Sequence, residues 1–173
     1  MRAAVRILGI DPGSRATGFG VVDVFGPTTK AVRWGVIRTE GNHDERLREI
    51  FYALGALVRE LKPEEIAVEK VFMHRNPDSA LKLGQARAAA ICATFDAALP
   101  LFEYTPRHIK KAVAGIGSAG KDQVQQMVRR ILGIAESVDA DAADALAAAL
   151  CHAHQRTARR FIAISTDRAA GQA

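Results

Sequence analysis

Four acidic residues occur at positions where a folded chain could bring them together. Asp11 and Glu69 each stand at the end of an apolar, strand-like run, and Asp141 and Asp144 lie three residues apart in an alanine-rich helical stretch. Residues three apart on a helix share one face. Mg²⁺ prefers a few carboxylate oxygens and keeps some of its waters, so acids gathered from strand ends and one helix face suit a hard divalent cation. Taken singly, each acid has a simpler reading as a turn, strand-end or helix-cap residue.

Positive charge is concentrated in one segment of the chain. The formal net charge is +5, yet the segment 105–130 alone holds six Lys and Arg against one acid, Asp122. A local basic cluster of this kind is typical of a phosphate-binding face. Together with the four acids, it indicates metal-assisted cleavage of nucleic acid.

Composition describes one ordinary globular domain. The 173 residues are 49% hydrophobic and 25% charged, enough to bury roughly 70% of the unfolded surface. We expect Cys92 and Cys151 to be buried free thiols, because free cysteine behaves as a small hydrophobe. The apolar run before Asp11 is too short for a secretory signal, and no run approaches the roughly 18 residues of a membrane span. We therefore expect a cytoplasmic protein with no membrane contact.

Hydrophobic periodicity predicts alternating strands and helices. Strands are expected at Val5–Ile10, Gly18–Phe25, Lys30–Ile37, Glu65–Glu69 and Leu101–Tyr104. Helices are expected from a capping box at Asn42 to Leu61, from Asn76 to about Leu99, around Ile109–Val113 and Val124–Leu132, and from about Ala140 to His154. This order favours an α/β fold with a mixed sheet. We expect a single domain over residues 1–157 and a loose C-terminal tail over residues 158–173.

A glycine-rich loop, 115–121, needs separate consideration. It fits G-x-G-x-x-G and most of a Walker motif, but Asp122 stands where a Ser or Thr should hold Mg²⁺. A cationic helical stretch also precedes the loop, where a nucleotide-binding motif requires a strand. The loop is better suited to present backbone N–H groups and Lys121 to a phosphate backbone.

The joint pattern resembles the RuvC family of Holliday-junction resolvases. The likeness rests on Gly9–Arg15 with Thr17-Gly18, on Val68–Met73 continuing through Asn76 and Asp78–Arg87, on Gly115–Ala119 with Lys121, and on Asp141–Ala147. It spans about residues 5–157 and departs at Phe19, where the family often has tyrosine. The resemblance implies a ribonuclease-H-like three-layer fold, with a five-stranded mixed sheet flanked by helices. It also implies a homodimer that cuts four-way DNA junctions with Mg²⁺ or Mn²⁺, beside the RuvA and RuvB branch-migration proteins in recombination and repair.

The resemblance also implies residue roles. Asp11 would bridge two metal ions, Glu69 would hold one, and Asp141 and Asp144 the other. Because four unpaired carboxylates repel, we expect at least one proton to be retained until metal arrives. Lys110 and Lys121 most resemble the family's phosphate-contacting lysines, and Arg75, Arg87 and Arg107 are lesser candidates for DNA contact. Phe72 and Met73 either plug the core or stack and wedge against an unpaired base.

Two symmetric cuts require two active sites, which favours a two-fold dimer. The helix from Pro77 to Leu99 is the candidate interface, although it could pack on its own sheet or do both. His152 lies about 12 Å along the helix from Asp144, too far to be a ligand. We expect His152 and His154 to be helix C-terminal residues favoured by the dipole. A related nuclease acting on RNA or other branched DNA, and a non-catalytic junction-binding protein, remain alternatives. An actin-like ATPase would need two such domains and a much longer chain.

Overall fold

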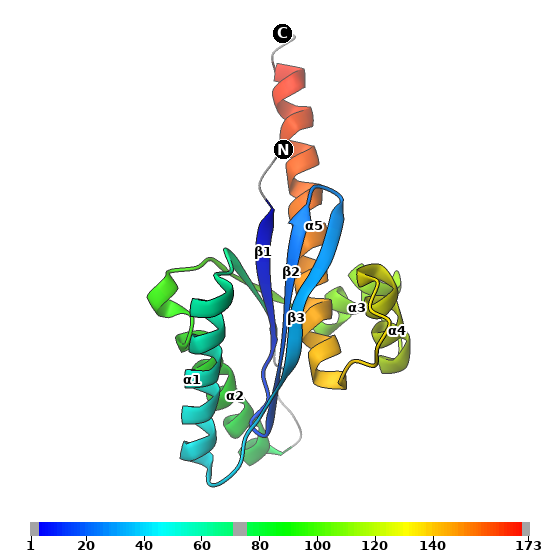
Figure 1. The fold of residues 1–173 in the computed structure, drawn as a ribbon. Coiled ribbons are helices and arrows are strands. Elements are labelled where there is room, and N and C mark those ends of the chain that lie inside the picture. The colour runs from blue at the N-terminus through cyan, green and yellow to red at the C-terminus, as the bar shows by residue number, and fades with distance from the viewer. Residues whose placement is uncertain (1–3, 71–75, 171–173) are drawn as a thin grey trace.

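The computed structural model describes residues 4–70 and 76–170, with side chains described up to residue 158. One mixed sheet runs through the centre of the molecule (Figure 1), in the strand order β3-β2-β1-β4-β5. Its strands are β1 (Val5–Asp11), β2 (Ala16–Phe25), β3 (Thr28–Arg38), β4 (Glu65–Glu69) and β5 (Leu101–Tyr104). The central strand β1 pairs antiparallel with β2 and parallel with β4. The five predicted strands and the mixed sheet are confirmed.

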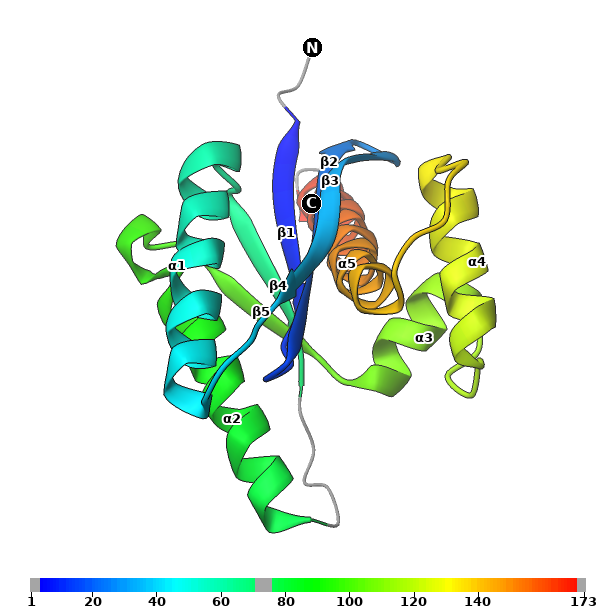
Figure 2. The same cartoon turned by 60° about the horizontal axis from the view of Figure 1, so that its bottom comes forward.

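Helices cover both faces of the sheet. On one face lie α1 (His43–Leu61), α2 (Pro77–Cys92) and the short 3₁₀ helix η1 (Phe95–Ala97). On the other face lie α3 (Pro106–Ala114), α4 (Lys121–Leu132) and α5 (Ala140–Ala170), as both views show (Figures 1 and 2). The molecule thus has three layers, helix–sheet–helix.

Strand alternation divides the interior into two cores. Ile7 of β1 packs in the core beneath α5, whereas Leu8 and Ile10 pack in the core beneath α1. Successive strand residues point to opposite faces, so the odd-numbered residues of β1 face α5. Burying an aliphatic side chain of this size contributes roughly 1.5–3 kcal/mol, which strongly fixes the register of the central strand. The same alternation directs Asp11 toward the α5 face.

Local capping sets where the first two helices begin. The Asn42 side chain accepts a hydrogen bond from the Glu45 backbone N–H at 3.0 Å, and the Glu45 carboxylate accepts one from the Asn42 N–H at 2.7 Å. This reciprocal pair is the predicted capping box. Asn76 caps α2 through the N–H groups of Asp78 and Ser79. Both predicted helix starts are confirmed.

The second predicted helix ends earlier than expected. It stops at Cys92 instead of near Leu99. The Thr94 hydroxyl donates to the Ile91 carbonyl at 2.8 Å, and Ala98 adopts a left-handed conformation with φ 49°. Threonine side chains that bond local carbonyls compete with the helix, and the left-handed Ala98 ends the short helix η1 that follows. Cys92, the last residue of α2, is exposed, so its predicted burial is wrong.

The last helix is longer than predicted. Instead of ending near His154, α5 continues to Ala170, so residues 158–170 are helical where an irregular tail was expected. No proline or glycine occurs between Ala140 and Ala170, and alanine and arginine are strong helix formers. The domain boundary at residue 157 stays a prediction. Among the described residues, no helix combines the length and apolar composition needed to cross a membrane.

Candidate active site

Two acids come from neighbouring parallel strands. Ile10 of β1 and Val68 of β4 are register partners, and Asp11 and Glu69 follow them directly at the same edge of the sheet. Ala67 packs in the core beneath α5, so Glu69, two residues further along β4, points to that same face. Asp11 and Glu69 therefore emerge side by side on the α5 side of the sheet.

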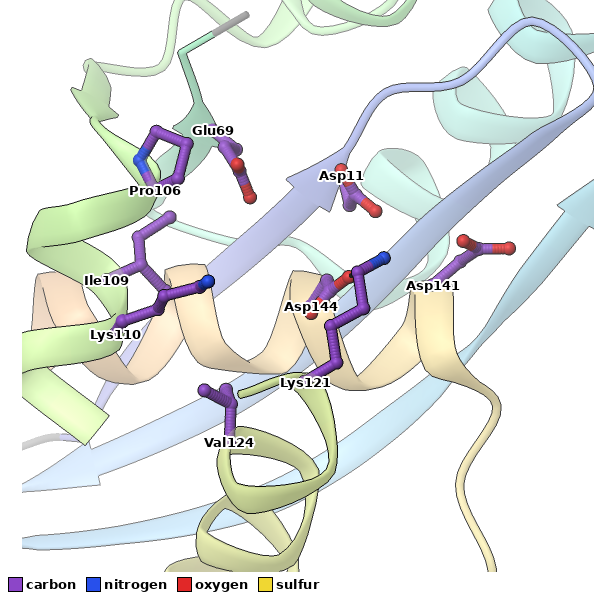
Figure 3. A pocket seen from close by; sticks show the side chains of 9 residues that line it. All are labelled: Asp11, Glu69, Pro106, Ile109, Lys110, Lys121, Val124, Asp141 and Asp144. Carbon is purple, nitrogen blue, oxygen red and sulfur yellow. Dashed lines mark ion pairs between the residues drawn. The ribbon is translucent and has the colours of Figure 1, made fainter. Parts of the chain in front are cut away.

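The other two acids come from the first turns of α5. Asp141 and Asp144 lie where this helix crosses the ends of β1 and β4, and Figure 3 shows all four carboxylates around one pocket. The pocket has a volume of about 280 Å³. It is lined by Asp11, Glu69, Pro106, Ile109, Lys110, Lys121, Val124, Asp141 and Asp144. The structure thus brings together four acids that are up to 133 positions apart in the sequence (11 to 144).

Asp11 is the most perturbed of the four acids. Burial raises its pKa to about 8, with further contributions from the negative charges of Asp144, Glu69 and Asp141, while Lys121 opposes the shift. In the absence of a bound metal ion, the Asp11 carboxyl therefore holds a proton at neutral pH. This agrees with the expectation that the acidic cluster retains a proton.

Two lysines moderate the repulsion. Burial raises the pKa of Glu69 and of Asp144, and in both cases Lys121 and Lys110 pull the pKa back down. The Lys121 ammonium lies 3.9 Å from the Asp144 carboxylate. Figure 3 shows both lysine side chains reaching toward the acids, Lys110 from α3 and Lys121 from α4. The pocket is acidic at its floor and basic at its rim.

The donor set fits hard divalent cations held by few protein ligands each. Within residues 4–70 and 76–170, no three His, Cys, Asp or Glu side chains already converge on a single point. Mg²⁺ is commonly held by one or two carboxylates and keeps several waters, so convergence of three is not required. The half-buried carboxylates Asp11, Glu69 and Asp144, whose pKa values are raised, also gain most from a neutralising cation. The chemistry of the pocket therefore matches the expected metal.

The turn that follows Asp11 is fixed by a buried hydroxyl. Thr17 is fully buried, and its hydroxyl donates to the Gly13 carbonyl at 2.8 Å. A Cβ at Gly13 would lie 2.2 Å from the Ala16 carbonyl oxygen, so the turn has no room for a side chain there. The tight Pro-Gly turn predicted between the first two strands thus holds the end of β1, and Asp11 with it.

Of the other predicted DNA-contacting residues, the two that the structure describes, Arg87 and Arg107, do not line the pocket. Arg107 is exposed on α3, with its side chain against Gly117 of the glycine loop. Arg87 forms an ion pair with Glu103 on the opposite face of the sheet. Phe72, Met73 and Arg75 lie outside the described residues. Lys110 and Lys121 alone among the described basic candidates line the pocket.

His152 occupies a different environment from the one predicted. It is buried in the middle of α5, not at a helix C-terminus, with its Nε2 2.7 Å from the Glu65 carboxylate and its Nδ1 2.6 Å from the Tyr104 hydroxyl. Glu65 shares its strand face with Glu69, and His152 lies two helical turns from Asp144. Periodicity along α5 and β4 assigns His152 and Glu65 to faces but does not pair them across the interface, and neither residue belongs to a recognised motif. His154 is exposed, near the Ala112 carbonyl.

The three layers and the acidic pocket at the ends of β1 and β4 define a protein of the ribonuclease-H-like class. The yeast mitochondrial Holliday junction resolvase Ydc2 shares this fold, with a TM-score of 0.65 at 13% identity over 95% of this chain and 86% of that one. T. thermophilus RuvC, solved in complex with a Holliday junction substrate, superposes with a TM-score of 0.83 at 37% identity. That match covers 88% of this chain and 95% of T. thermophilus RuvC.

Sequence comparison narrows the class to one family. The family described as "Crossover junction endodeoxyribonuclease RuvC" matches residues 7–152. The crossover junction endodeoxyribonuclease RuvC of Alkalilimnicola ehrlichii is 56% identical over 151 residues, which cover 87% of this chain and 92% of the relative. The chain belongs to the RuvC family of crossover junction endodeoxyribonucleases.

Proposed function

We propose that this chain resolves four-way DNA junctions by hydrolysing phosphodiester bonds with divalent metal ions. The observation that carries the proposal is the pocket in which Asp11, Glu69, Asp141 and Asp144 meet beneath Lys110 and Lys121. Acids that can hold cations and lysines that can hold a phosphate are thereby placed a few ångströms apart. Membership of the RuvC family supports the four-way junction as the substrate.

The four acids would hold the metal. Asp11, which lies between the strand acid Glu69 and the helix acids, would be shared by two Mg²⁺ ions. Glu69 would complete the site of one ion, and Asp141 and Asp144 that of the other; Mn²⁺ would fit the same donors. When bound, the ions supply the Lewis acidity that activates a water and stabilises a leaving oxygen in an in-line displacement.

The chain's own residues would prepare the phosphate for attack. The Lys121 ammonium, 3.9 Å from the Asp144 carboxylate, is placed to pair with a phosphate oxygen beside the acids and to offset charge that develops there. Lys110 would make the second phosphate contact from α3. The proton on Asp11 would leave as cations enter, because a positive charge favours the carboxylate form.

A junction with two-fold symmetry calls for two copies of the chain. Within the chain, α2 buries Ala86 and Ala90, while Leu81 on the same helix is 64% exposed. We propose the exposed side of α2, which carries Leu81, as part of an isologous homodimer interface. By the same family resemblance, we propose that the dimer works with the RuvA and RuvB proteins in recombination and repair.

The test compares a synthetic four-way junction with a linear duplex and an RNA–DNA hybrid of matched sequence, each with and without Mg²⁺. The expected result is paired symmetric nicks in the junction alone, only with Mg²⁺. Asp11→Asn should abolish these nicks while leaving junction binding intact, because the basic rim is untouched. Preferential cutting of the hybrid would instead favour a related nuclease. Wild-type cutting by Asp11→Asn would remove the four acids from the chemistry.

A further inference from the structure

Three glycines form the part of the sheet directly beneath the first turns of α5. A Cβ at Gly18 would lie 1.9 Å from the Asp141 carbonyl oxygen, and one at Gly9 would lie 2.0 Å from the Ala145 carbonyl oxygen. At Gly20 it would lie 2.6 Å from Cγ of the Leu146 side chain. Real Cβ contacts essentially never fall under 3.0 Å. The helix therefore rests on bare strand backbone, and we call Gly9, Gly18 and Gly20 the glycine seat.

Gly18 has a special place in the glycine seat, because it lies between two of the site acids. Asp11 and Gly18 are register partners on β1 and β2. Gly18 is also the residue on which the backbone of Asp141 rests. Gly18 thus pairs with Asp11 in the sheet and also packs against the helical turn that carries Asp141. Its missing side chain sets how closely these two carboxylates can approach.

We propose that Gly18 is a positioning residue, which fixes the separation between Asp11 and the Asp141/Asp144 pair at the value that metal binding requires. The proposal rests on the proposed function, since it concerns the same acids. Gly18 itself has no group that could touch a metal or a phosphate. It acts only through the distance at which α5 meets the sheet.

A methyl group at Gly18 would open that distance. The contact with the Asp141 carbonyl would have to widen from 1.9 Å to at least 3.0 Å, and its partner is helix backbone, not the end of a flexible side chain. Asp144 lies on the same rigid turn and would move with Asp141, whereas Asp11 and Glu69 would stay with the sheet. Loss of a support that orients metal ligands typically costs about 10–100-fold in metal affinity.

The experiment titrates Mn²⁺ into the full chain and measures free Mn²⁺ by electron paramagnetic resonance. Gly18→Ala should raise the Kd for Mn²⁺ by about tenfold or more. The control is Val21→Ala, because Val21 is fully buried on β2 but faces the opposite core, away from α5. It should destabilise the protein and leave the Kd unchanged. Equal Mn²⁺ binding by Gly18→Ala and wild type, or an equal loss in Val21→Ala, would overturn the proposal.

A second variant separates positioning from general damage. Asp141→Glu adds one methylene, which lengthens the reach of the carboxylate by about 1.5 Å. It should weaken Mn²⁺ binding in the wild-type chain but restore part of it in Gly18→Ala, a coupling that a merely structural glycine would not produce. Additive effects of the two changes would count against the proposal. If Gly18→Ala does not fold, Asp141→Glu alone tests the separation, because it moves the carboxylate without touching the sheet; Mn²⁺ binding equal to wild type would then overturn the proposal.

Asp11→Asn distinguishes the two levels of inference. If wild type and Asp11→Asn bind Mn²⁺ alike, the acids are not the metal site, and the proposed function and the role of Gly18 fall together. If wild type binds Mn²⁺ through Asp11 but Gly18→Ala binds it equally well, only the role of Gly18 is lost.

Discussion

The His152 imidazole and the Glu65 carboxylate meet across the interface between α5 and β4, with 2.7 Å between Nε2 and Oε2. Arg156, one turn further along α5, contacts the same carboxylate at 2.9 Å, and the Tyr104 hydroxyl completes the group from β5. Glu65 begins the strand that ends in Glu69. The contact therefore anchors α5, which carries Asp141 and Asp144, to β4, which carries Glu69.

This anchor predicts acid-sensitive stability. Burial disfavours the charged Glu65, but hydrogen bonds from Arg156 and His152 outweigh burial and hold its pKa below the ordinary 4.5. An acid with a depressed folded-state pKa stabilises the fold above its unfolded pKa, and that contribution disappears as pH falls through the folded value. Glu65→Gln should therefore cost on the order of 1–3 kcal/mol at pH 7 and progressively less as the pH falls below 4.5, as measured by urea unfolding. The exposed Glu49→Gln is the control, and a loss independent of pH would contradict the prediction.

The raised pKa of Asp11 predicts the opposite pH dependence of stability. Its pKa is raised from 3.8 to about 8, so ionisation opposes folding; the penalty is absent below about pH 4, grows between the two values and is complete above pH 8. In EDTA, Asp11→Asn should therefore be more stable than wild type at pH 8 and above, by on the order of a few kcal/mol, and equal to it near pH 4. Thermal unfolding against pH measures this, with the exposed Asp96→Asn as control. A destabilised Asp11→Asn at pH 8 would refute the strain in the acidic cluster.

Lys121 predicts a change in salt dependence. If it contacts a phosphate, Lys121→Ala should weaken junction binding and reduce the slope of log K against log salt by about 1. Fluorescence anisotropy with a labelled junction in EDTA measures binding without cutting. Lys30→Ala is the matched control, because Lys30 is exposed on β3 away from the pocket. An unchanged slope for Lys121→Ala would remove this lysine from the DNA face.

Leu81 predicts the oligomeric state. Leu81→Asp should convert a dimer to a monomer, because it places a charge in an apolar interface. Light scattering after gel filtration gives the mass directly. Phe25→Asp provides the control, since Phe25 is 46% exposed but lies at the turn between β2 and β3, away from α2. A dimer that survives Leu81→Asp would move the interface off this part of α2.

Local patterns in the sequence were sufficient to predict the order of strands and helices and the grouping of the four acids. Apolar runs within residues 5–11 and 65–69 predict strands whose ends carry Asp11 and Glu69, and the capping box at Asn42 predicts the start of α1. These features depend on neighbours a few residues apart. The four acids could be grouped because Asp11 and Glu69 end strands, and Asp141 and Asp144 share one face near the start of a helix.

Features that depend on tertiary contact could not be predicted in the same way. His152 resembled any helical histidine until Glu65 and Tyr104 were brought to it from two strands. Arg87 resembled a free cation until β5 supplied Glu103. The early end of α2 is different, because it accompanies a local hydrogen bond from the Thr94 hydroxyl to the Ile91 carbonyl. For His152 and Arg87, the partner lies on a strand that periodicity along the chain does not place.

Helix α5 carries both site acids and the residue that anchors the helix to the sheet. Asp141 and Asp144 line the pocket, and His152, two turns further along, contacts Glu65. An α-helix turns by about 100° for every residue, so adding or deleting one residue between Asp144 and His152 would swing one end away from its partners while the other stayed in place. Substitutions in this stretch can be absorbed locally, but a change in its length cannot. The number of residues between Asp144 and His152 is therefore fixed. We expect no insertions or deletions in this part of α5.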